Sequence, residues 1–112
     1  MAAGLGPCNA HLKGLADAAQ EWLTGASTKD YPGYDKLMAH VLADSAERQV
    51  AAGSAFIGSP ADIVDMLRAY NDKVGGIDSV SLHFTPGDMP VEMAERSLRL
   101  FSREVLPHVA RL

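Results

Sequence analysis

The sequence is short of the residues on which several classes of protein depend. It has one cysteine, Cys8, so no disulfide can form within the chain, which is consistent with a reducing cytosol. Its lysines and arginines form no cluster, which argues against a phosphate-binding stripe for nucleic acid. No apolar run reaches the roughly 18 residues of a membrane span, and residues 1–7 lack the basic start and long apolar core of a signal peptide. We therefore expect a cytoplasmic protein that binds neither nucleic acid nor membrane.

Metal ligands are equally sparse. Cys8 has no second cysteine beside it, and three of the four histidines are far apart with no ligand spacing between them: His11, His40 and His108. Structural metal sites require several such ligands at short, defined spacings. We therefore expect no metal site.

What the chain does have is enough apolar residues for one small core. Its 112 residues are 47% hydrophobic and carry a formal net charge of −4, and a chain of this length supports one domain and is too short for two. Glycines and a proline stand among alanines at the start. We expect a single domain over residues 1–112, with residues 1–8 irregular.

The first half of the chain has helical spacing of its apolar residues. We expect a helix that begins at an N-cap on Asn9 and stops at Gly25. After a polar loop, a second helix should end at a break on Asp44-Ser45, and a short third helix should end at Gly53. Two or three helices therefore precede the part of the chain that carries the main pattern.

The next helix, over about residues 60–74, has a well-defined start and stop. Ser59 is its expected N-cap, with Pro60 at the first position and Asp62 at the third, close to a capping box that adds roughly 1 kcal/mol. Gly75 supplies a left-handed C-cap. The Gly58-Ser59-Pro60 turn is also compatible with an anion on free backbone N–H groups, although a plain cap is the commoner use. The apolar face is expected to be Ile63, Leu67, Tyr70 and Val74.

Two stretches are predicted to be strands. Residues 54–58 are long enough only for a short one, whereas residues 77–84 alternate between two faces. One face has the apolar residues Val80, Leu82 and Phe84, and the other has Ser79, Ser81 and His83. A last amphipathic helix follows from about Pro90 and is ended or kinked at Pro107. The order β-α-β-α predicts an α/β fold with a parallel sheet covered by helices, although the chain is mostly helical by residue count.

Several of these stretches together resemble one family. The run Ala55-Phe56-Ile57-Gly58-Ser59-Pro60-Ala61-Asp62 is similar to the "G-[ST]-P-[ED]" element of the bacterial luciferase-like monooxygenases. Three further stretches fit that family in order and spacing: Asp30-Tyr31-Pro32-Gly33-Tyr34 before a helix, residues 76–84, and residues 97–107 as the closing helix. The resemblance covers most of the chain, from Tyr31 onward.

What the resemblance implies is the C-terminal β-α-β-α portion of a (β/α)8 TIM-type barrel. Members of this family bind reduced flavin, either FMN or a deazaflavin, and often activate oxygen. A full barrel takes about 250 residues, and the family's flavin-phosphate site lies upstream of the matched portion, so no cofactor-binding residue can be assigned here. The resemblance therefore implies part of a flavin-dependent oxidoreductase that is inactive alone, with an upstream barrel polypeptide as partner.

His83 is the candidate catalytic residue. In a barrel its face of the strand would point inward near the C-terminal end, where the active sites of such barrels lie, so His83 would be an acid, a base or a hydrogen-bond donor near a flavin or substrate. Ser81 on the same face and Thr85 in the following loop are pocket candidates. The alternative for His83 is a histidine satisfied in a core or at an oligomer contact, because no partner acid or nucleophile at motif spacing accompanies it.

Two hypotheses of different classes remain open. The first is the part of a luciferase-like enzyme, and the second is a non-catalytic α/β module that self-associates. Either way, strands without neighbours expose their edges and one face. We therefore expect a homo-oligomer, a dimer or higher, with residues 77–84 or the flanking helices in the contact.

Overall fold

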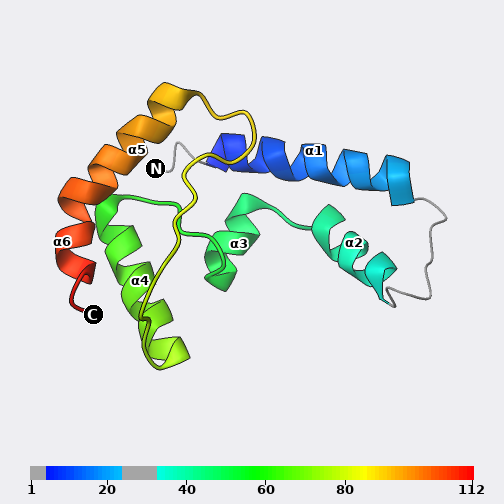
Figure 1. Ribbon diagram of the computed structural model, residues 1–112. Coiled ribbons are helices and arrows are strands. Elements are labelled where there is room, and N and C mark those ends of the chain that lie inside the picture. The colour runs from blue at the N-terminus through cyan, green and yellow to red at the C-terminus, as the bar shows by residue number, and fades with distance from the viewer. Residues whose placement is uncertain (1–4, 24–32) are drawn as a thin grey trace.

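The computed structural model describes residues 5–23 and 33–112, and these residues form helices and connections (Figure 1). The helices in chain order are α1 (Leu5–Leu23), α2 (Tyr34–Leu42), α3 (Ala46–Ala52), α4 (Pro60–Val74), α5 (Val91–Glu104) and α6 (Leu106–Val109). Among the helices of the described part, none has the length and apolar character that crossing a membrane requires. The expected Gly25 stop and residues 30–32 lie outside the described ranges.

The α/β expectation is wrong, and with it the β-α-β-α portion of a TIM barrel. No residue of the described ranges belongs to a strand. Residues 54–58 form a short irregular connection, and residues 77–84 form a long open trace between α4 and α5, drawn in yellow in Figure 1. A strand exists only when a neighbour about 4.8 Å away accepts and donates its backbone hydrogen bonds. Among the described residues, no backbone hydrogen bond joins residues 54–58 to residues 77–84, so neither stretch has that neighbour.

The start of α1 also differs from the expectation. The helix begins at Leu5, so residues 5–8 are helical and Asn9 is inside the helix rather than at its cap. Pro7 is compatible with this start because the first turn of a helix leaves its N–H groups without partners in any case. The side chain of Asn9 caps a different helix, as described below.

The caps of α3 and α4 are confirmed. Ser45 accepts a hydrogen bond from the Arg48 N–H at the start of α3, which ends at Gly53 with φ 74°. At α4, the Ser59 hydroxyl accepts from the Asp62 N–H, and the Asp62 carboxylate accepts from the Ser59 N–H at 2.8 Å. This is the capping box expected from the sequence. The last long helix breaks at Val105, after which Pro107 lies in the first turn of α6.

The core is small. In the described part, the buried apolar side chains are Ala46, Val64, Leu67, Ala94 and Val105. Val64 and Leu67 of α4 pack with Val105, and Phe56, Ile63, Phe101 and Val109 cover them in part. The face of α4 expected to be buried continues beyond this cluster, but its residues Tyr70 and Val74 are exposed. The Tyr70 ring meets Phe56 only in an edge-to-face contact, with the ring centroids 6.0 Å apart.

The molecule is open for its length. Its radius of gyration is 16.4 Å, whereas a compact domain of this length has about 13 Å. Its accessible surface is 8290 Å², whereas a compact protein of 11.9 kDa exposes roughly 6,000 Å². The helices form two groups: α1 contacts α2 and α3, while α4, α5 and α6 contact one another. Apolar surface therefore remains uncovered between and around the groups.

Candidate functional site

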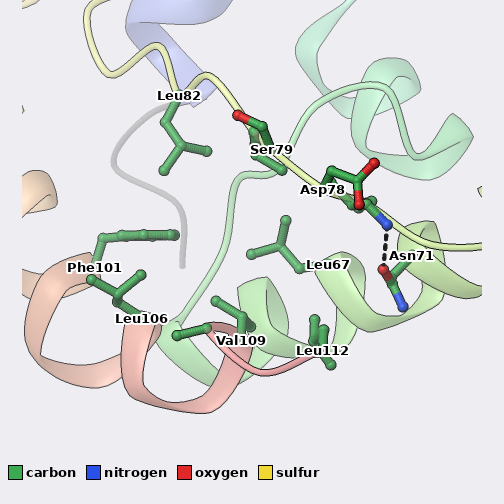
Figure 2. Close-up of a pocket in the computed structure, with 12 residues that line it drawn as sticks. Leu67, Asn71, Asp78, Ser79, Leu82, Phe101, Leu106, Val109 and Leu112 are labelled. Carbon is green, nitrogen blue, oxygen red and sulfur yellow. Dashed lines mark hydrogen bonds between the residues drawn. The ribbon is translucent and has the colours of Figure 1, made fainter.

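The candidate site is built around residues 77–84, which we call segment 77–84. Gly75 and Gly76 have φ angles of 80° and 120°, a backbone conformation that residues with a Cβ rarely adopt. This double glycine turns the chain at the end of α4. The side chain of Asn71 then accepts a hydrogen bond from the Ile77 N–H at 2.9 Å (Figure 2). The start of segment 77–84 is therefore fixed against the last turn of α4.

Beyond Ile77 the segment has no backbone partner. Within the part of the chain that the structure describes, no backbone hydrogen bond involves the N–H or C=O groups of residues 78–85. The segment is also largely exposed, with Val80 47% and Leu82 40% accessible. Both backbone edges of this stretch are therefore free to water.

A cavity of about 310 Å³ lies between segment 77–84 and the helices α4, α5 and α6. In Figure 2, Leu82 extends from the segment toward the cavity, Leu67 from α4, and Leu106 and Val109 from α6. The complete lining is Leu67, Asn71, Ile77, Asp78, Ser79, Val80, Leu82, Phe101, Leu106, Val109, Ala110 and Leu112. The walls are mainly apolar, and no lysine, arginine or histidine is among them.

The three residues selected from the sequence do not line this cavity. His83, Ser81 and Thr85 are all exposed. In the described residues, no hydrogen bond or ion pair joins His83 to another side chain. The apolar neighbour Phe84 instead packs edge-to-face on Phe101, with the ring centroids 5.8 Å apart. From Val80 onward the apolar residues Val80 and Leu82 line the cavity and Ser81 and His83 do not, whereas Ser79 lines it together with Val80, contrary to the alternation. The catalytic role of His83 stays a prediction.

In the turn before α4, the Asp62 carboxylate occupies the position in which an external anion would bind. The Asp62 carboxylate accepts hydrogen bonds from both the Ser59 hydroxyl, at 2.6 Å, and the Ser59 N–H. These two hydrogen bonds, the one from the hydroxyl foremost, lower the pKa of Asp62 below its ordinary value. A Cβ on Gly58 would lie 2.8 Å from the Asp62 Cβ, so glycine is required at that position. The geometry therefore favours the plain cap over an anion site.

A second polar cluster joins α1 to α3. The Asn9 carboxamide accepts a hydrogen bond from the Ala46 N–H at 2.8 Å and donates to both oxygens of Glu47 at 3.1 Å. Hydrogen bonds from its own backbone N–H and from Asn9 lower the pKa of Glu47. Cys8 lies nearby, and its pKa is raised by burial and then by the charges of Asp44 and Glu47. A thiol with a raised pKa is a poor nucleophile, so this cluster is structural.

Sequence reasoning missed most of the cavity wall. Leu106, Val109 and Leu112 come from α6 and the residues after it, and their spacing of three is a helical signal that continues past Pro107. Asn71 was missed as well, although an asparagine just before a double glycine is a recognisable signal for a side chain that binds the turn.

No group of three or more histidine, cysteine, aspartate or glutamate side chains that could hold a metal ion occurs among the residues described. Comparison of the chain with protein-family models, curated proteins and solved structures finds no match in any of the three. The resemblance to the luciferase-like monooxygenases therefore depends on the residue pattern alone.

Proposed function

We propose that this chain is a non-catalytic association module, and that its partner is a second copy of itself. The observation that carries the proposal is the amount of surface left uncovered. The chain exposes 8290 Å², roughly 2,300 Å² more than a compact protein of its mass. A stable interface buries only about 800 Å² on each partner. The excess exposed surface of one chain is therefore larger than the area that a dimer contact would bury.

The uncovered surface is apolar where segment 77–84 crosses α4 and α6. Val80, Leu82, Leu106 and Leu112 are each at least 40% exposed and all line the 310 Å³ cavity. Continuous exposed apolar surface of this kind marks an interaction site in a soluble protein. Burial of these side chains yields about 25 cal/mol for each Å² removed from water. This surface is where we place the contact.

The test is the mass of the purified chain in solution. We expect light scattering to give twice 11.9 kDa at high micromolar concentration and a decrease toward the single-chain mass on dilution. Leu82→Asn should shift this equilibrium toward the monomer, because it places a polar group in the contact. Val91→Asn is the matched control, since Val91 is 74% exposed on α5 and does not line the cavity. A single-chain mass at every concentration up to 200 μM would contradict the proposal.

The second candidate is the flavin-dependent oxidoreductase part that the resemblance implies. One observation favours it: the two stretches that carry the resemblance, residues 55–62 and 97–107, share the core, since Phe56 and Phe101 both pack against the cluster that contains Val105. The described residues do not fit FMN or a deazaflavin, because the cavity has no cationic side chain for a phosphate and Asp62 fills the helix start. We therefore derive no flavin step.

A fluorescence titration of FMN separates the two candidates. Quenching that saturates at one FMN per chain supports the enzyme part, and its absence leaves the association module. An upstream polypeptide as an additional partner and a cytoplasmic location stay predictions from the sequence.

A further inference from the structure

The free backbone edge of segment 77–84 indicates how two copies meet. We infer that the segments of two copies pair as an antiparallel ribbon whose two-fold axis passes through Leu82. The inference deepens the proposed function and rests on it. It concerns a contact between two chains, whereas each chain alone keeps the helical fold described above.

The first step of the argument is the unpaired backbone. The N–H and C=O groups of residues 78–85 make no backbone hydrogen bond in the described part of the chain. The chain bends at Asp78 and then runs without a turn over residues 79–85, and an extended stretch with both edges free is a template for another extended stretch. A helix face of a partner would cover the side chains but would leave these groups unpaired. Only an extended peptide can pair with these backbone N–H and C=O groups, so we expect the partner to contribute an extended segment.

The second step is the symmetry of a dimer. In a two-fold contact, if residue i faces residue j then j also faces i. Directly opposite residues of an antiparallel pair point to the same side of the ribbon. One residue must therefore lie directly opposite its own copy, and the two-fold axis passes between the two. Once that residue is chosen, the partner of every other residue in the ribbon is fixed.

The third step is the side-chain pattern, which favours Leu82 as that residue. With the axis at Leu82, the apolar pairs are Leu82 with Leu82 and Val80 with Phe84 of the second copy. On the other side, Ser81 faces His83 and Ser79 faces Thr85. Between Ser79 and Thr85, apolar residues meet apolar residues and hydrogen-bonding residues meet one another, which is the arrangement that stabilises a ribbon.

Neighbouring choices of the axis are poorer. An axis through His83 keeps apolar pairs but places Asp78 opposite Asp88, two like charges. An axis through Ser81 places Asp78 opposite Phe84, and an axis through Val80 places Asp78 opposite Leu82, so each buries a carboxylate against an apolar side chain. With the axis at Leu82, Asp78 falls opposite Pro86, at the end of the ribbon. The two Asp78 side chains are then about 26 Å apart along the strands, well beyond the roughly 8 Å over which exposed charges interact at physiological salt. This matters because each copy has a formal net charge of −4.

The ribbon also accounts for the apolar surface. Val80 and Leu82 already face the cavity, and Phe84 already packs on Phe101. In the ribbon, the same three side chains of the second copy lie on that same side, next to the first set. The exposed parts of Val80 and Leu82 would then be covered by Phe84 and Leu82 of the other copy.

The experiment is a pair of spin-label distances by pulsed electron paramagnetic resonance. Ser79→Cys and Thr85→Cys are made separately in a Cys8→Ser background. Both positions are exposed, but Ser79 also lines the cavity, so circular dichroism checks that each label leaves the fold intact. With the axis at Leu82 both labels lie six residues from their copies, so the two backbone separations should be equal, at about 20 Å.

Other arrangements give other distances. An axis through Ser81 gives about 13 Å at position 79 and about 26 Å at position 85, and a parallel pairing gives about 5 Å at both. Unequal or much shorter distances in a sample that light scattering shows to be dimeric would overturn the ribbon and leave self-association standing. A monomeric mass with no dipolar coupling would overturn the proposed function itself.

Hydrogen exchange of the unlabelled chain is a second measurement. Alternate amides of residues 79–85, those on the edge that faces the second copy, should exchange more slowly at 200 μM than at 2 μM, and the amides of α2 are the internal control. If the dimer forms without slower exchange in residues 79–85, the ribbon is wrong.

Discussion

At the scale of single residues, a reciprocal cap fixes the start of α4. Ser59 and Asp62 satisfy one another's backbone and side-chain groups through three hydrogen bonds. Ser59→Ala should therefore lower the free energy of unfolding by about 1 kcal/mol, measured by urea denaturation. Ser97→Ala, an exposed serine within α5, is the control and should be neutral or slightly stabilising, since alanine favours helices. Equal effects of the two changes would contradict the role of the cap.

The same cap predicts a pH dependence. Hydrogen bonds from Ser59 lower the pKa of Asp62 in the folded chain. The stabilisation is therefore fully present above the unfolded pKa of about 4 and is lost as the pH falls through the lower folded pKa. Between pH 5 and pH 3 we expect the urea midpoint to fall, and to fall less in Asp62→Asn. Asp65→Asn on the same helix is the control, because no hydrogen bond to the Asp65 carboxylate occurs in the described residues, and its slope should match that of the wild type.

At the scale of elements, one asparagine holds α1 against α3. Ala46 is completely buried, and its N–H has the Asn9 carboxamide as its partner. Asn9→Ala leaves that donor unsatisfied, which should cost about 1–3 kcal/mol. Asn9→Asp keeps the acceptor but turns a carboxylate toward Glu47, so it should be destabilising at pH 7 and recover in part near pH 4. Unfolding followed by circular dichroism at both pH values distinguishes these outcomes, and equal loss in both variants at both pH values would argue against the contact.

The elements that could be predicted from the sequence are those whose ends are set by residues close to them in the chain. Ser45, Ser59 and Gly75 act on the backbone within four residues of themselves, so the ends of α3 and α4 followed from the sequence. Asn9 was misassigned because its side chain bonds Ala46, 37 positions away. The strands were misassigned because alternation describes only the side chains of residues 77–84, whereas a strand also requires a neighbouring backbone. The cavity was missed because it depends on α6 returning to α4 across the break at Val105.

At the scale of the whole molecule, the open shape predicts that stability depends on protein concentration. Association of folded chains stabilises them by mass action, by about 2.7 kcal/mol when the partner is at one hundred times its Kd. The Tm from circular dichroism should therefore rise by on the order of 5–10 °C between 2 μM and 200 μM. Leu82→Asn should reduce this rise, and Val91→Asn should not. A Tm that is independent of concentration in the wild type would count against self-association.

The free edges of segment 77–84 have a consequence for handling the protein. A ribbon of two strands still presents one outer edge on each strand, and each of those edges is able to accept a further chain. A closed pair and an open-ended fibre thus compete for the same hydrogen-bonding groups, and slow growth of fibres on long storage at high concentration is the expected hazard. Proline in place of Ser81 would remove one N–H from one edge of the strand, so it should weaken the assembly that uses that edge.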